Sequence, residues 1–271
     1  MKAKLAILDM NDQVPNQGMR CIKEIVSEYQ DRLDWDVFDV RGKNELPDMS
    51  YDIFISSGGP GSPLEEGLWR DSFLELLDQI RVDNAKVTSR KKFVFFICYS
   101  FQIACQHFGL GDVTKRRKTS FGVYPVHKTK AGKSEPILEP LDDPYYAIDS
   151  RDWQVVQPRL EVFEEHGAQI LSLEKIRTHV EYERAIMSVR FSPELVGTQF
   201  HPEADSDGML VHLSSDEMKN KIVENFNADK YFRMLSDLND PEKVEKTHST
   251  ILPKFISMSL AAIEKQHLVL N

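Results

Sequence analysis

The fold is decided by the stretch Phe96-Ile97-Cys98-Tyr99-Ser100-Phe101-Gln102. The continuous apolar run at 93–97 predicts a central strand, and residues 100–108 have a helical pattern. A strand that turns directly into a helix presents the residue at the turn, Cys98, at the carboxyl edge of the sheet. Unpaired N–H groups at the start of the helix favour a thiolate there. The alternative is a buried cysteine that packs as a small apolar residue.

Strand and helix patterns alternate on both sides of this turn through the first half of the chain. Strands are predicted at 5–8, 35–40, 53–55 and 93–97, and helices at 16–30, 73–80 and 100–108. Such alternation implies an α/β fold, a mostly parallel twisted sheet with helices on both faces, as in flavodoxin-like proteins. From about residue 119 the rhythm changes, and further strands are predicted at 121–126, 153–156 and 195–198.

Composition narrows the classes of function. The 271 residues are 41% hydrophobic with a net charge of -9, which suits one large domain, or one domain with an appendage, and argues against nucleic acid as a partner. No apolar run is long enough to cross a membrane and the N-terminus has no signal-peptide pattern, so we expect a cytoplasmic protein. The three cysteines suggest no disulfide scaffold, and the eight histidines have no metal-ligand spacing. We therefore expect neither a metal nor a cofactor.

A second strand end carries the triplet His201-Pro202-Glu203, directly after the strand predicted at 195–198. A histidine can take a proton from a thiol and return it to a leaving amine, and a carboxylate can orient the ring and stabilise its cation. On its own the triplet is equally typical of a solvated loop. The triplet indicates a catalytic role only because Cys98, at the end of another strand, could lie next to it in the fold.

A third strand end is followed by the loop Ser56-Ser57-Gly58-Gly59-Pro60-Gly61. Such a cluster is common in ordinary turns. It can also present a backbone N–H, bare of side chain, to a developing oxyanion. It is not a phosphate-binding P-loop, because no Gly-Lys-Ser/Thr follows.

Together the three motifs resemble the class I glutamine amidotransferases, which carry a Gly-Gly-Pro loop, a Cys-x-Gly-x-Gln turn and a His-Pro-Glu triplet in this order. The likeness covers about residues 1–227 and is strongest to the glutaminase domains of GMP synthases and their stand-alone relatives. It implies a Cys-His-Glu catalytic set of Cys98, His201 and Glu203, with the backbone N–H groups of Gly59 and Tyr99 forming the oxyanion hole.

The resemblance also implies a substrate, L-glutamine or a related small-molecule amide. Gln102 matches a glutamine at the substrate pocket, and Ser150 and Arg151 lie where the family recognises its substrate. The implied reaction is attack of the Cys98 thiolate on the side-chain amide, release of ammonia and hydrolysis of a glutamyl thioester. No synthetase domain is visible in the sequence, so either the ammonia acceptor would be a separate subunit or the protein would act as a hydrolase of a γ-glutamyl amide.

The sequence departs from the family pattern at two positions around the nucleophile. The family usually has glycines where this chain has Phe96 and Ser100. Ser100 is a mild change, whereas Phe96 is bulky enough that it could alter the pocket. A basic run, Lys115-Arg116-Arg117-Lys118, is interpreted as a solvated loop, with a partner or phosphate site as the alternative.

Two other functions fit parts of the pattern. A homoserine O-acyltransferase uses the same Cys, His and Glu set, and Gly122-Val123-Tyr124 and Ser150-Arg151 resemble its segments. The loop at 56–61 and Gly197-Thr198-Gln199-Phe200 favour the amidotransferase. A non-catalytic, partner-dependent relative is the third hypothesis, and the intact Cys, His and Glu argue against it.

The tail at 228–271 is predicted to be a helical extension of the domain at 1–227. A stripe of apolar side chains at helical spacing is formed by Leu252, Phe255, Ile256, Leu260 and Ile263. The stripe is expected to pack, either back onto the domain, which we favour, or as a homodimer face or a docking site for the acceptor subunit.

Overall fold

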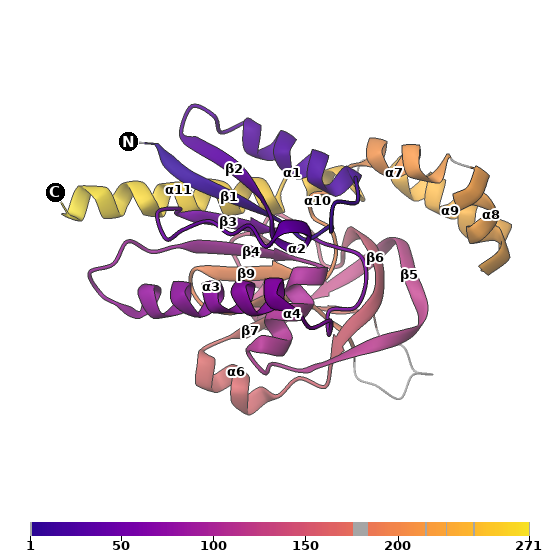
Figure 1. Cartoon of the computed structure of the whole chain (residues 1–271). Coiled ribbons are helices and arrows are strands. Elements are labelled where there is room, and N and C mark those ends of the chain that lie inside the picture. The colour runs from indigo at the N-terminus through magenta and orange to yellow at the C-terminus, as the bar shows by residue number, and fades with distance from the viewer. Residues whose placement is uncertain (1, 176–183, 215, 226, 241, 271) are drawn as a thin grey trace.

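The computed structural model describes residues 2–175, 184–214, 216–225, 227–240 and 242–270. They form one sheet of nine strands with helices on both of its faces (Figure 1). This is the α/β class predicted from the sequence. The strands are β1 (Ala3–Asp9), β2 (Leu33–Asp39), β3 (Ile53–Ser56), β4 (Phe93–Ile97), β5 (Asp112–Lys128), β6 (Tyr145–Val156), β7 (Gln169–Glu174), β8 (Ile186–Arg190) and β9 (Leu195–Thr198).

The helices range from single turns to long rods. They are α1 (Gln17–Ser27), α2 (Val40–Lys43), α3 (Leu68–Ala85), α4 (Tyr99–His107), α5 (Lys130–Lys133), α6 (Leu160–His166), α7 (Ser206–Leu213), α8 (Asp216–Asn225), α9 (Ala228–Leu238), α10 (Glu245–His248) and α11 (Ile251–Leu270).

The sheet is mixed, with the order β2-β1-β3-β4-β9-β8-β7-β5-β6. The first five strands in this order are parallel, as strand–helix alternation predicts, and the remaining neighbours pair antiparallel. The antiparallel part comes from the region where the sequence rhythm changes. The interpretation of 115–118 as a loop is wrong: these residues lie within β5, and the Arg116 side chain, only 6% exposed, forms an ion pair with Glu174 at 3.2 Å.

Two layers of helices bury the parallel strands. Because successive side chains of a strand point to opposite faces, Leu5 and Ile7 pack with α1 and α11, while Ala6 and Leu8 pack with α3 and α4. This double coverage explains why the strands read as continuous apolar runs. It also brings the carboxyl ends of β1, β3, β4 and β9 to one edge of the sheet.

The apolar stripe of the tail lies in the core of the described structure. Its five members are 0–3% exposed, and the Phe255 ring meets Phe95 of β4 with centroids 5.2 Å apart. The hydroxyl of Tyr29, just after α1, donates a hydrogen bond to the carbonyl of Pro253 at 2.9 Å. Within the described residues, no helix is long and apolar enough to span a membrane.

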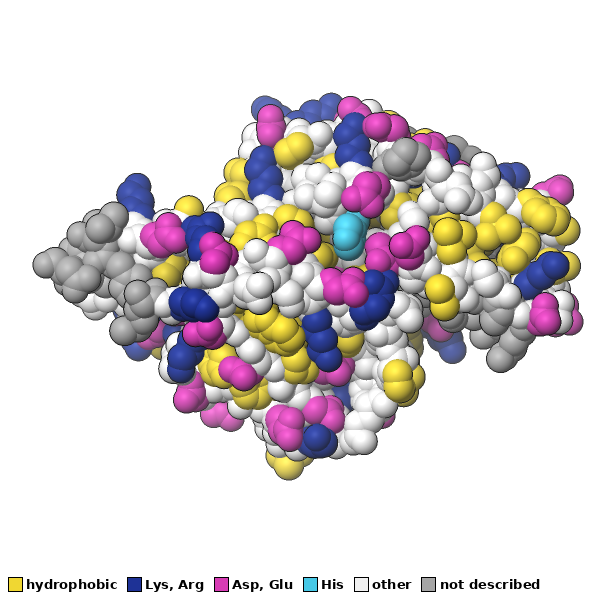
Figure 2. Space-filling view, turned by 90° about the horizontal axis from the view of Figure 1, so that it is seen from above, with side chains coloured by type: hydrophobic (Ala, Val, Ile, Leu, Met, Phe, Trp, Pro, Cys, Tyr) yellow, Lys and Arg dark blue, Asp and Glu magenta, His cyan; other side chains and the backbone are white. Residues whose placement is uncertain are grey.

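Helices α7, α8 and α9 form the opposite end of the molecule from the C-terminus (Figure 1). They cover the β5–β6 hairpin through a separate apolar cluster that includes Val123, Ile148 and Met234. Hydrophobic side chains gather on the outside of this end (Figure 2), where Val211 is 67% and Phe232 is 62% exposed.

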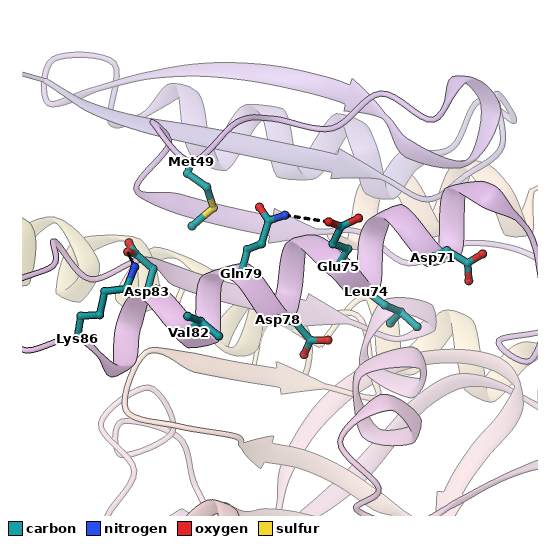
Figure 3. Close-up of a pocket in the computed structure, with 9 residues that line it drawn as sticks. All are labelled: Met49, Asp71, Leu74, Glu75, Asp78, Gln79, Val82, Asp83 and Lys86. Carbon is teal, nitrogen blue, oxygen red and sulfur yellow. Dashed lines mark hydrogen bonds and ion pairs between the residues drawn. The ribbon is translucent and has the colours of Figure 1, made fainter.

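A hollow of about 680 Å³ runs along the outer side of α3, beneath Met49 (Figure 3). Its polar side chains bond mainly to one another along the helix: Gln79 bonds Glu75 at 3.3 Å, and Lys86 bonds Asp83 at 3.1 Å. None of the residues predicted to be catalytic lines it.

Candidate active site

Cys98 occupies a sharp turn between β4 and α4. Its φ of 46° and ψ of -94° are strained for a residue with a side chain, and such strain is typical of functional positions. The turn is fixed from both sides. On one side, the Cys98 N–H donates to the carbonyl of Thr198 on β9 at 2.8 Å. On the other side, the Ser100 hydroxyl accepts a hydrogen bond from the Ile97 N–H at 3.0 Å. The same hydroxyl donates to the carbonyl of Ser56 at 2.8 Å. Ser100, in place of the family's glycine, therefore ties the turn to the end of β3.

Phe96 does not line the cavity at the strand ends, because its ring packs in the apolar core on the α3 and α4 side of the sheet. It is fully buried and packs against Phe191, with ring centroids 5.4 Å apart. Its partner on β9 is Gly197, where a Cβ would lie 2.9 Å from the Phe96 Cβ. Position 197 therefore has no room for a side chain beside Phe96.

His201 and Glu203 follow β9, the strand next to β4, so the two strand ends bring them to Cys98. The His201 N–H donates to the carbonyl of Ile148 at 2.9 Å, and its Nδ1 hydrogen-bonds Oε1 of Glu203 at 2.8 Å. The Cys98 side chain is also close enough to His201 to raise the pKa of the imidazole. The three predicted catalytic side chains thus form one chain of contacts, from sulfur to imidazole to carboxylate.

The neighbouring charges change the pKa of His201. Burial lowers the pKa of His201, but the charges of Glu203 and Cys98 outweigh burial and hold this pKa well above its ordinary value. These charges favour the protonated form of His201. Burial raises the pKa of Cys21 to about 12 and that of Cys105 well above its usual value. Both remain unreactive thiols.

The glycine loop lies against the same group. A Cβ on Gly58 would come within 2.8 Å of the His201 ring, and a Cβ on Gly59 within 2.2 Å of the carbonyl oxygen of Met10. Real Cβ atoms do not approach so closely, so both positions require glycine. The loop can reach Cys98 only because side chains are missing here.

Arg41, at the start of α2, holds this loop in place and was not identified from the sequence. Its guanidinium donates to the carbonyls of Met10 at 3.0 Å and Pro60 at 2.7 Å, and lies 4.8 Å from the centre of the Tyr99 ring. The side chain is only 5% exposed and is neutralised by Glu65 at 2.9 Å. No sequence pattern marks it, because its partners are backbone atoms of two distant loops.

Cys98, His201 and Glu203 line a cavity of about 750 Å³. Gln102, Ser150 and Arg151, the predicted substrate-binding residues, line it as well, and the Cys98 thiol faces the carbonyl of Ser150 at 3.8 Å. The Arg151 guanidinium, however, is 1% exposed and bound by Asp149 at 2.9 Å, so its charge is already matched. In the described parts of the chain, no cluster of His, Cys, Asp or Glu side chains could hold a metal ion.

Comparison with known structures supports the fold. The chain is similar to a glutamine amidotransferase from Thermotoga maritima (TM-score 0.69, 17% identity, covering 96% of this chain and 99% of that one). It is also similar to a putative GMP synthase subunit from Thermoplasma acidophilum (0.58, 13%, 99% and 98%). A third similar structure is the glutaminase domain of Trypanosoma brucei CTPS with bound acivicin (0.58, 14%, 97% and 94%).

At these identities the structural likeness concerns the fold alone. A sequence comparison with proteins of curated function finds no match. The family model of the class I glutamine amidotransferases, however, matches residues 6–221, most of the chain and all three motifs. The chain therefore belongs to the class I glutamine amidotransferase family.

Proposed function

We propose that this protein hydrolyses the side-chain amide of L-glutamine, or of a related small amide, with Cys98 as nucleophile. The observation that carries the proposal is the contact chain from Cys98 through His201 to Glu203, with Cys98 at a strained strand–helix turn. The cavity of about 750 Å³ over this group is large enough for a small-molecule substrate.

The proposed reaction has two halves. The Cys98 thiolate attacks the amide carbon, and the protonated His201 gives its proton to the departing nitrogen, so that ammonia leaves and a glutamyl thioester forms. His201, now neutral, takes a proton from water, which attacks the thioester. Glutamate is released and the Cys98 thiolate with its imidazolium partner is restored. Glu203 keeps the ring oriented and stabilises its cation throughout.

Each tetrahedral intermediate places negative charge on the former carbonyl oxygen. The backbone N–H groups of Gly59 and Tyr99 are proposed to stabilise it. Fixed backbone donors of this kind cost no reorganisation when the charge develops, which makes them effective. Support comes from the position of the glycine loop, which Arg41 holds between the end of β1 and the Tyr99 ring.

The ammonia acceptor is proposed to be a separate subunit. The apolar end formed by α7–α9 suits its binding, because Met209 and Val211 of α7 belong both to that end and to the rim of the cavity. A homodimer through the same surface is the other assembly that this exposed patch allows. The cytoplasmic location expected from the sequence is part of the proposal.

The direct test is ammonia release from L-glutamine by the purified chain, with and without candidate acceptor subunits. The Cys98→Ala variant should release none above background, because no other side chain of the group can form the thioester. Acyl transfer from acyl-CoA to homoserine, without glutamine turnover, would instead identify the acyltransferase alternative. If neither reaction depends on Cys98, the proposal is wrong.

Covalent labelling gives a second expected result. An electrophilic glutamine analogue such as acivicin should modify Cys98 alone at neutral pH, since Cys21 and Cys105 are held as thiols by burial. Mass spectrometry of proteolytic peptides would locate the adduct. L-Glutamine in excess should slow the labelling, and an adduct confined to Cys21 or Cys105 would contradict the assignment.

A further inference from the structure

The C-terminal segment reaches the catalytic loop through one side chain. His248, the last residue of α10, donates a hydrogen bond from Nδ1 to the backbone carbonyl of Glu203 at 2.9 Å. The donor is Nδ1–H because a carbonyl oxygen only accepts. His248 lies beyond residue 221, where the match to the family model ends. We propose that His248 is a positioning residue for the reaction, which holds Glu203 where it can orient His201; the inference rests on the proposed function.

Glu203 needs such support because its own side chain is held at one end only. Oε1 bonds His201, while Oε2 is buried and has no hydrogen-bond partner among the described residues. The preceding residue is Pro202, which has no N–H to anchor the loop. The carbonyl of Glu203 gives the backbone of this residue a hydrogen bond to a side chain from another part of the chain, His248 of α10. Loss of this bond frees the carboxylate to move relative to the ring.

His248 is itself firmly placed. The hydroxyl of the neighbouring Thr247, a buried residue, donates to the carbonyl of Tyr146 on β6. Val244, at the other end of α10, packs in the apolar cluster with Ile148, whose carbonyl accepts from the His201 N–H. The backbone contacts of His201 and Glu203 thus converge on one small region.

The segment also supports the nucleophile. α11 begins directly after this region, and its Phe255 packs on Phe95 of β4, the strand that ends at Cys98. A single stretch of chain thus contacts the strand of the nucleophile and the loop of the acid. Both ends of the contact chain from Cys98 to Glu203 are supported by residues that the likeness to a glutaminase domain at 1–227 did not include.

Variants of His248 test the proposal. His248→Leu keeps comparable bulk and removes the donor, whereas His248→Asn keeps an N–H near the position of Nδ1. We expect the leucine variant to lose about 10- to 100-fold in kcat with little change in KM, the scale of a misplaced catalytic group. The asparagine variant should recover much of that loss. Lys246→Ala is the matched control, because Lys246 lies on the same helix as His248 but its ammonium pairs with Asp142, at 2.7 Å, away from the catalytic loop.

A readout independent of substrate separates this proposal from the proposed function. Alkylation of Cys98 by iodoacetamide depends on the thiolate–imidazolium pair and not on glutamine. It should slow in the leucine variant and recover in the asparagine variant, even if L-glutamine proves not to be the substrate. His248→Ala replaces the leucine variant if that one does not fold. The proposal would be overturned if a folded variant without the donor kept the wild-type kcat and labelling rate. It would also be overturned if the asparagine variant were no better than the leucine variant.

Discussion

Glu203→Gln is expected to lower kcat by up to about 10⁴-fold, the loss found when the acid that orients a catalytic histidine is replaced by its amide. Glu203 is 1% exposed and holds Nδ1 of His201 at 2.8 Å. A neutral amide keeps the shape of the side chain, but it no longer stabilises a positive charge on His201. Because the carboxylate is not expected to touch substrate, KM should change little. Steady-state ammonia release measures both constants.

The same variant should change the pH profile in a defined direction. Glu203 raises the pKa of His201 against the opposing effect of burial, so without its charge this pKa falls. The alkaline limb of kcat/KM, which reports loss of the His201 proton, should move to lower pH. The raised pKa of His201 also contributes to the free energy of unfolding. This contribution is full below the ordinary pKa of 6.5, and it is lost as the pH rises through the raised pKa. Glu164→Gln, on exposed α6, is the control, and an unmoved alkaline limb in Glu203→Gln would contradict this account.

Gly59→Ala is expected to reduce kcat by about 10²- to 10³-fold, as does loss of one oxyanion donor. The new Cβ would lie 2.2 Å from the carbonyl oxygen of Met10, which is backbone and cannot swing aside. The loop must shift, and its N–H moves away from the reacting carbonyl. Overpacking of this kind also lowers stability by about 1–3 kcal/mol. Ammonia release and thermal unfolding measure the two effects.

Leu64→Ala is the matched control for this variant, since Leu64 is in the same loop and 39% exposed. It should leave both activity and melting temperature almost unchanged. A Gly59→Ala enzyme with normal kcat would remove Gly59 from the proposed oxyanion hole, whatever its stability.

The parallel half of the fold was predictable because each signal was local. The strand at Phe93–Ile97 is a continuous apolar run and the turn follows it at once, so both bounds of β4 agree with the sequence. The strand at Leu195–Thr198 was predicted with equal accuracy. Residues after such strands meet at one edge of a parallel sheet, which is why Cys98 and His201 could be paired in advance.

The antiparallel half was not predictable in the same way, because its polar residues are paired only in the folded chain. Arg116 looks like part of a solvated run, yet it is buried against Glu174, far away in the sequence. Arg151 looks available for a substrate carboxylate, and Asp149 already binds it. Arg41 makes its contacts with carbonyl groups, which every residue possesses. Contacts of this kind cannot be predicted from residue spacing or from the hydropathy pattern of the sequence.

Phe96 and Gly197 lie opposite each other in register on β4 and β9. A Cβ at position 197 would lie 2.9 Å from both the Cβ and the carbonyl oxygen of Phe96, and 3.0 Å from the Phe101 ring. Any side chain there would push apart the two strands whose ends carry Cys98 and His201. Glycine at 197 therefore sets how closely the nucleophile and its histidine can approach each other.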